Sequence, residues 1–282
     1  MFYCDVNNDI WKYIRHILRL YAVWTIIYFP LTYILSHGDM NWISYIKECV
    51  YKGSFSHLWY LPSIAVAMLV VYLISKKVDD RIVMCISFLL YFIGAFADTY
   101  SWLIYGTVLE GSIRSILNVF MTTRNGVFFL PIYVAMGKCI AKYKKKHMNQ
   151  SSVTGYLLFF SMVLFLLEGI LMAKKQSIDT NYYFTLLFLV PLLLLMLLYR
   201  DKSGNRISDE TSIFLRKESS IIYYMHYLAL YCCNFVFHII GVDYERYHSI
   251  EFISAVCSSL IIGWILISVD KHTRIKFLRI LI

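Results

Sequence analysis

A run of apolar residues long enough to cross a membrane is the feature that most constrains this chain. Residues 57–75 read HLWYLPSIAVAMLVVYLIS, in which a polar and aromatic start precedes an uninterrupted apolar stretch. A membrane-spanning helix needs about 20 mostly apolar residues. Trp59 stands near the start, and Trp favours the membrane interface because its ring is apolar whereas its N–H needs a polar partner. The run predicts a transmembrane helix whose first turn meets one membrane surface.

The rest of the chain contains further apolar runs of similar length. Hydrophobic residues make up 59% of the 282 residues and charged residues only 16%, whereas about 25% of an ordinary soluble domain is charged. Because lipid offers no hydrogen bonds to the backbone, runs of this length are expected to span it as helices. The prediction is an all-α, polytopic bundle of about eight spans in one domain, 1–282. The spans are expected at about 14–36, 57–75, 81–99, 124–142, 154–173, 182–199, 219–240 and 250–269.

The distribution of basic residues between the two sides of the membrane indicates the orientation of the spans. Only seven of the 27 Lys and Arg residues fall in connections on one side of the predicted membrane, and the rest fall on the other. Basic connections stay in the cytoplasm, so both termini are expected there, in a multi-pass protein of a bacterial cytoplasmic membrane. The formal net charge of +9 does not indicate nucleic-acid binding, because the basic residues lie in short clusters between apolar runs.

Several classes of site are disfavoured. The seven cysteines show no CxxC or Cys/His spacing, so we expect apolar packing roles for them and no metal site. No Walker loop, GxGxxG, HExxH or nucleophile elbow is present, which argues against ATP-driven transport and hydrolase chemistry. Residues 1–9 are polar and lead into no cleavage site, so insertion is expected to depend on the spans themselves.

Three polar residues are predicted to lie at one membrane rim. Glu168 is set in LLFFSMVLFLLEGILMA, where an unpaired carboxylate costs a few kcal/mol, so a functional role is the default interpretation. Arg124 and His57 begin two other predicted spans at the same depth. Each also has a structural interpretation: an ion pair for Glu168, membrane anchoring for Arg124, and a hydrogen bond to a loop carbonyl for His57.

Two further groups of polar residues lie nearer the cytoplasm. His226 is predicted in the cytoplasmic half of its span, beyond reach of that rim, in a structural polar network with Tyr223 and Ser220. Arg15 and Arg19 are four residues apart, on one face of the first span. Paired guanidinium groups suit phosphate, on a lipid or on a donor such as coenzyme A, although simple membrane anchoring explains them equally well.

Five segments in order carry a resemblance to a known family: KYIRHILRLYAVW, HLWYLPSIAVAMLV, TRNGVFFLPIYVAMGKCIA, LLEGILMAKKQSIDTNYYFTLLFLVP and LRKESSIIYYMHYLAL. Together they resemble the acyltransferase 3 family, which includes carbohydrate O-acetyltransferases and the membrane half of membrane-bound serine racemases. The resemblance covers nearly the whole chain. Family members usually have about ten spans and open with a helix that carries the catalytic His. The first span here matches the basic third helix, so we expect the chain to lack the first two helices and that His.

The resemblance implies transfer of an acyl group, usually acetyl, from cytoplasmic acyl-CoA to a hydroxyl of an extracytoplasmic or lipid-linked glycan, with no bound cofactor. Such a reaction needs a base at the acceptor hydroxyl and a cationic site for the donor. The expected donor residues are Arg15 and Arg19. The expected acceptor-side residues are His57 as the base, Trp59, Arg124 and Glu168. Two alternatives remain: a transporter or flippase of a lipid-linked sugar, and a noncatalytic remnant or partner subunit.

Overall fold

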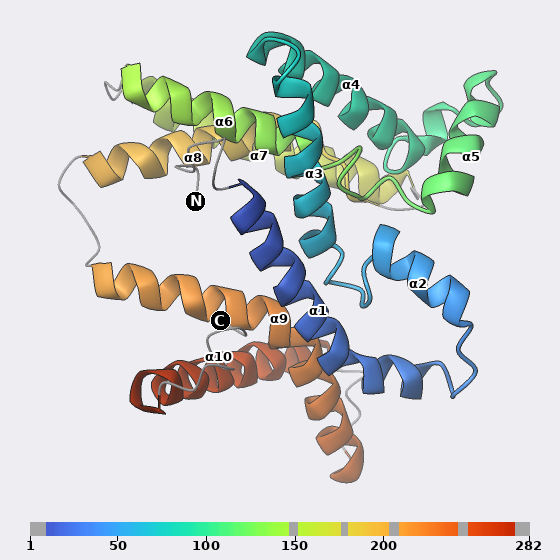
Figure 1. Cartoon of the computed structure of the whole chain (residues 1–282), viewed down its shortest axis with the longest axis vertical. Coiled ribbons are helices and arrows are strands. Elements are labelled where there is room, and N and C mark those ends of the chain that lie inside the picture. The colour runs from blue at the N-terminus through green and yellow to red at the C-terminus, as the bar shows by residue number, and fades with distance from the viewer. Residues whose placement is uncertain (1–9, 147–151, 176–179, 203–208, 242–247, 274–282) are drawn as a thin grey trace. The chain divides into compact units, whose positions relative to one another are not determined.

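The computed structural model describes residues 10–146, 152–175, 180–202, 209–241 and 248–273, all helices and connections with no strand (Figure 1). This confirms the predicted all-α class. The described helices are α1 (Ile10–Leu35), α2 (Trp42–Tyr51), α3 (Tyr60–Ser75), α4 (Asp80–Ala97), α5 (Leu109–Phe120), α6 (Pro131–Lys146), α7 (Ser152–Lys174), α8 (Leu186–Lys202), α9 (Asp209–Ile239) and α10 (His248–Thr273), with a 3₁₀ turn η1 (Ser101–Leu103).

Five helices are long and apolar enough to cross a membrane: α1, α4 and most of α7, α9 and α10. Helix α3 and the first part of α8 are apolar but shorter. The chain is therefore a multi-pass membrane protein, whereas the count of eight spans and the cytoplasmic termini stay predictions. The starts of two predicted spans are wrong, since 124–142 and 182–199 both begin with non-helical residues and α8 begins only at Leu186. Residues 124–130 form a non-helical connection and α6 begins only at Pro131, where proline suits the first helical turn because it needs no N–H partner there.

The chain divides into two compact units, which we describe separately. Unit 1 comprises Met1–Leu18, Trp42–Gly53 and Trp59–Arg206, and unit 2 comprises Arg19–Asn41, Ser54–Leu58 and Ile207–Ile282. Helix α1 contributes to both. The prediction of one domain over 1–282 stays a prediction.

Unit 1 encloses an extended segment, residues 180–185, which precedes α8. Tyr182 is fully buried; its N–H donates to Oγ1 of Thr99 at 2.8 Å and its hydroxyl donates to the Thr123 carbonyl at 2.5 Å. Gly94 of α4 makes room for this ring, since a Cβ there would lie 2.6 Å from Cζ of Tyr182. Side-chain contacts thus fix the Tyr182 backbone, whereas the carbonyls of residues 183–185 accept hydrogen bonds from the first turn of α8.

Unit 2 contains the hairpin of α9 and α10, which lie side by side (Figure 1). Nζ of Lys217 lies 2.8 Å from Oδ2 of Asp270 across the hairpin. One helical position further on, Glu218 is buried against Gly263, where any Cβ would lie 2.7 Å from Oε1. The glycine therefore allows α10 to approach a buried carboxylate.

Candidate functional site

His57 lies at the centre of an aromatic cluster in unit 2. The connection that carries it precedes α3, and only 7% of the residue is exposed. Its ring stacks on Tyr227, with centroids 5.0 Å apart and planes 13° apart, and meets Tyr28 edge-on at 5.0 Å. The ring of His226 lies 4.8 Å from it, centroid to centroid. Two imidazoles are thus brought together in surroundings otherwise built of aromatic rings.

The ring nitrogens of the two histidines differ in their partners. Both nitrogens of His57 are buried, and neither makes a hydrogen bond to any described residue. In His226, Nδ1 lies 2.8 Å from the Tyr223 carbonyl and 3.1 Å from the Ile222 carbonyl. Because a carbonyl can only accept, Nδ1 of His226 is the donor in these contacts. The buried nitrogens of His57 are polar groups whose lack of a hydrogen bond needs an explanation, and a role in a functional site is one.

The backbone on either side of the cluster is fixed by tyrosine hydroxyls. Tyr223 donates to the carbonyl of His57 itself. Tyr28 donates to the Tyr224 carbonyl at 2.7 Å and accepts from the Leu228 N–H at 3.2 Å, across from α1 to α9. These bonds join both imidazoles to the same helices, so neither ring depends on a flexible loop for its position.

This geometry corrects the prediction for His226. It also places only one of the two predicted partners of His226 in the cluster. His226 was expected to lie beyond reach of His57, but the two rings are in contact, because α9 is long and His226 sits near its middle. Tyr223 joins the same cluster. Ser220 does not, since its hydroxyl donates to the Arg216 carbonyl one turn back.

Arg124 occupies a different polar network, in unit 1. Its guanidinium carbon lies 5.0 Å above the centre of the Trp59 ring. One N–H of NH1 donates to Oδ1 of Asn181 at 3.0 Å. The amide of Asn181 in turn donates to Oδ2 of the buried Asp98 at 3.1 Å. Arg124 is thus held by an aromatic face and an amide, and it pairs with no carboxylate among the described residues.

The turn that carries Arg124 is shaped by the next two residues. Oδ1 of Asn125 accepts from the N–H groups of Val127 and Phe128, at 2.8 and 3.1 Å, and its Nδ2 donates to the Thr122 carbonyl at 2.7 Å. Gly126 touches α3 so closely that a Cβ would overlap the Ser63 carbonyl oxygen. Asn125 therefore closes the turn, as asparagine often does through its side chain, and Gly126 lets the turn dock.

Glu168 of α7 has its carboxylate occupied by protein donors. The N–H groups of Phe184 and Thr185 donate to it at 2.8 and 3.0 Å, and the hydroxyls of Thr185 and Tyr100 donate as well. The two N–H groups directly precede α8, where a helix has no internal acceptors and favours negative charge. These contacts favour a structural role for Glu168 as a cap supplied by the neighbouring helix. A catalytic role for Glu168 stays a prediction.

Two of the three predicted rim residues, Arg124 and Glu168, lie in unit 1 and can be compared directly. Arg124 and Glu168 contact different partners and not each other among the described residues. His57 belongs to unit 2 and is described apart from them. Arg15 and Arg19 are both exposed on α1, as a site for a soluble donor requires, and their role is untested by the structure.

Two carboxylates that the sequence did not single out are buried. Asp98 follows the apolar run of α4 directly, and Glu218 lies in the charged sequence RKESS. Each looks like an ordinary residue at the end of a span, so no local signal distinguishes them. Their burial arises from contacts with Asn181 and Gly263, which lie far along the chain.

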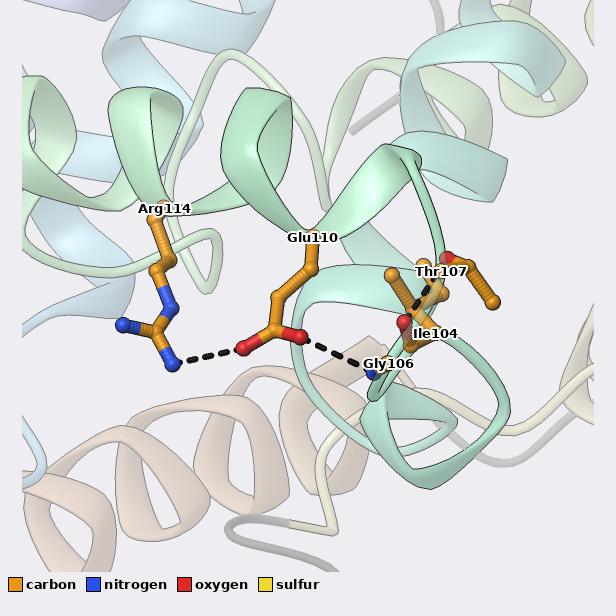
Figure 2. A network of polar contacts seen from close by, with 5 residues as sticks. All are labelled: Ile104, Gly106, Thr107, Glu110 and Arg114. Carbon is orange, nitrogen blue, oxygen red and sulfur yellow. Dashed lines mark hydrogen bonds and ion pairs between the residues drawn. The ribbon is translucent and has the colours of Figure 1, made fainter.

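A third carboxylate, Glu110, lies at the surface on α5. It accepts from the Gly106 N–H at 2.9 Å and from the Arg114 guanidinium at 2.5 Å, and the Thr107 hydroxyl donates to the Ile104 carbonyl alongside (Figure 2). The Gly106 N–H and, next, Arg114 hold the pKa of Glu110 below its ordinary value. These bonds fix the turn between η1 and α5.

Comparison with known proteins identifies the class. The profile of the acyltransferase 3 family, described as an acyltransferase domain, matches residues 7–268. The chain therefore belongs to the acyltransferase 3 family, as the five sequence segments predicted.

The chain is also similar to part of several racemases. It is 23% identical to an amino-acid racemase of Enterococcus faecalis over 96% of this chain and 38% of that protein, and 31% identical to another from the same species over 53% and 22%. It is 27% identical to a serine/alanine racemase of Enterococcus gallinarum over 67% of this chain and 28% of that protein. The chain thus spans well under half the length of these relatives. No solved structure matches it.

Proposed function

We propose that the protein is a membrane acyltransferase that moves an acyl group, most simply acetyl, from cytoplasmic acyl-CoA to a hydroxyl of an extracytoplasmic or lipid-linked glycan. The observation that carries this proposal is the His57 imidazole, whose two ring nitrogens are buried without partners beside His226. Family membership supplies the reaction class.

The chemistry requires one proton acceptor. The acceptor hydroxyl oxygen attacks the thioester carbonyl of acyl-CoA, and an imidazole nitrogen takes the hydroxyl proton. The new C–O bond forms, the C–S bond breaks, and the coenzyme A thiolate leaves and takes up the proton. The products are the glycan ester and free coenzyme A. His57 is proposed as this proton acceptor, with His226 as the neighbouring ring that positions it.

The donor needs cationic groups for its phosphates. Arg15 and Arg19, exposed on α1 four residues apart, are proposed for this role because guanidinium groups bind phosphate through paired N–H donors. Trp59 is proposed to line the acceptor side, where a sugar ring packs well on an aromatic face.

The proposal is tested by acetyl transfer from radiolabelled acetyl-CoA to cell-envelope glycan in membranes that contain the protein. We expect label in glycan with the wild type and at least a 100-fold lower rate with His57→Ala, the size of a lost general base. His238→Ala is the matched control, because His238 is exposed at the end of α9. An unchanged rate in well-inserted His57→Ala protein would show that His57 is not the base. An absence of transfer by the wild type would favour a transporter or flippase.

A further inference from the structure

The guanidinium of Arg124 keeps most of its hydrogen-bonding capacity unused. It makes one hydrogen bond, to Asn181, and one ring contact, to Trp59, and no other polar contact with the described residues. Its fork of N–H groups matches the two oxygens of a carboxylate or phosphate group. An arginine that only anchored the chain to the membrane surface would need neither partner.

The nearest acid in this network is placed so that it orients Arg124 without pairing with it. Asn181 stands between them: its Oδ1 accepts from Arg124, and its Nδ2 and N–H donate to Asp98 at 3.1 and 3.3 Å. The negative charge of Asp98 polarises the amide, which strengthens the bond to Arg124. The positive charge of Arg124 therefore remains available to a ligand, whereas a direct ion pair would have neutralised it.

The site is also held rigid before any ligand arrives. The Trp59 ring supports one face of the guanidinium, and Asn125 and Gly126 lock the turn beneath it. A guanidinium on an aromatic face loses little further freedom on binding an anion. One positive charge beside one buried carboxylate suits a ligand group with a single negative charge better than a dianion.

We propose that Arg124 is the binding site for a singly charged oxyanion group, a carboxylate or a phosphodiester, carried by the acceptor. This inference rests on the proposed function, because it names the acceptor as an anionic glycan or an anionic lipid-linked sugar. Neutral glycans lack the group that Arg124 binds, so they are poor acceptors.

Binding is tested with the purified full chain in maltoside detergent, which contains no anion. The probes are methyl β-glucuronide and methyl β-glucoside, which differ only in having a carboxylate or a hydroxymethyl group, and phosphatidylglycerol as the phosphodiester. A ligand that binds the folded state raises the midpoint of thermal unfolding in proportion to its affinity. We expect the glucuronide, phosphatidylglycerol or both to raise the midpoint, and the glucoside to leave it unchanged.

The variants decide whether Arg124 is responsible. Arg124→Gln is expected to weaken binding of the effective anion about tenfold or more, the size of a lost charge-assisted contact. Arg124→Lys keeps the positive charge, so it serves as a conservative variant should Arg124→Gln fail to fold. It is expected to bind the anion with intermediate affinity. Arg114→Gln is the control, because Arg114 is exposed and pairs with the neighbouring Glu110 on α5. A response to neither anion, or equal responses in wild type and Arg124→Gln, overturns the proposal.

The same probes and variants, used in both binding and transfer assays, distinguish a failure of this inference from a failure of the proposed function. Binding of an anion through Arg124 without acetyl transfer would sustain the anion site and refute the acyltransferase proposal. Equal transfer to glucuronide and glucoside, unaffected by Arg124→Gln, would sustain the acyltransferase and refute the anion site. A response to the glucuronide alone assigns the site to a soluble carboxylate, and a response to phosphatidylglycerol alone assigns it to a lipid phosphodiester.

Discussion

The imidazole rings of His57 and His226 lie 4.8 Å apart, centroid to centroid, although one precedes α3 and the other lies near the middle of α9. The two rings are therefore part of one aromatic cluster, and a change at either is expected to affect the other.

Because the two rings are in contact, we expect them to act as a unit in acyl transfer. His57→Gln and His226→Gln should each lower the rate of transfer by about 100-fold or more, and the double variant should be little slower than the worse single one. Initial rates with radiolabelled acetyl-CoA, normalised to inserted protein, measure this. Losses that multiply in the double variant would mean that the histidines act independently.

Gly126→Ala is expected to destabilise unit 1. The added methyl group would overlap the Ser63 carbonyl oxygen and lie 2.6 Å from Cβ of Val66, and overpacking of this kind costs about 1–3 kcal/mol. Thermal unfolding in detergent should show a midpoint lower by several degrees. Gly155→Ala is the matched control, since a Cβ there meets nothing within 4 Å. An equal effect of both substitutions would contradict the close approach at Gly126.

Glu168→Gln is expected to lower stability rather than to block chemistry directly. An amide in place of the carboxylate turns one acceptor into a donor that faces the N–H groups of Phe184 and Thr185, and each buried group left unpaired costs about 1–3 kcal/mol. Transfer activity per folded molecule should stay within a fewfold of wild type. Glu210→Gln, at an exposed position on α9, is the control. A stable but inactive Glu168→Gln protein would restore the catalytic interpretation.

The turn between η1 and α5 is expected to loosen at acid pH. The pKa of Glu110 is lower in the folded chain than in the unfolded chain, so its stabilising contribution is complete above the unfolded pKa and is lost as the pH falls through the folded pKa. Hydrogen exchange at Gly106, corrected for the intrinsic pH dependence, should speed up over that interval. Glu110→Gln should abolish the pH dependence, and its persistence would assign the effect to another group.

Composition and the length of apolar runs predict the long apolar helices well because lipid leaves the backbone few alternatives, whereas α2 and α5 lie outside the predicted spans. The residues 57–75 illustrate this, since all but the first three lie in α3. Family membership was likewise predictable, because the five segments occur in the family order and the profile match covers 7–268.

The non-helical segments were not predictable from hydropathy. Residues 124–130 and 182–185 fall within predicted spans, but they are non-helical and are held by side-chain hydrogen bonds such as those of Asn125 and Thr99. The Tyr182 backbone depends on Thr99, and Glu168 caps a helix that follows it in the chain. A window along the sequence contains none of these partners.

The contact between the rings of His57 and His226 was not predicted, for a different reason. The assumed topology assigned each histidine a depth from the charges of the connections, which fixes neither the length nor the tilt of a helix. The 31 residues of α9 exceed a single membrane crossing. The depth of His226 in the membrane therefore cannot be found by counting residues from one end of α9.

During synthesis, α7 leaves the ribosome before the residues that satisfy its carboxylate. Tyr100 is already present, but Phe184 and Thr185, whose N–H groups bind Glu168, emerge only after the helix is complete. Until then an acidic group would enter lipid without its full set of donors, at a cost of several kcal/mol. The stable placement of α7 in the membrane is therefore expected to depend on the segment that leads into α8.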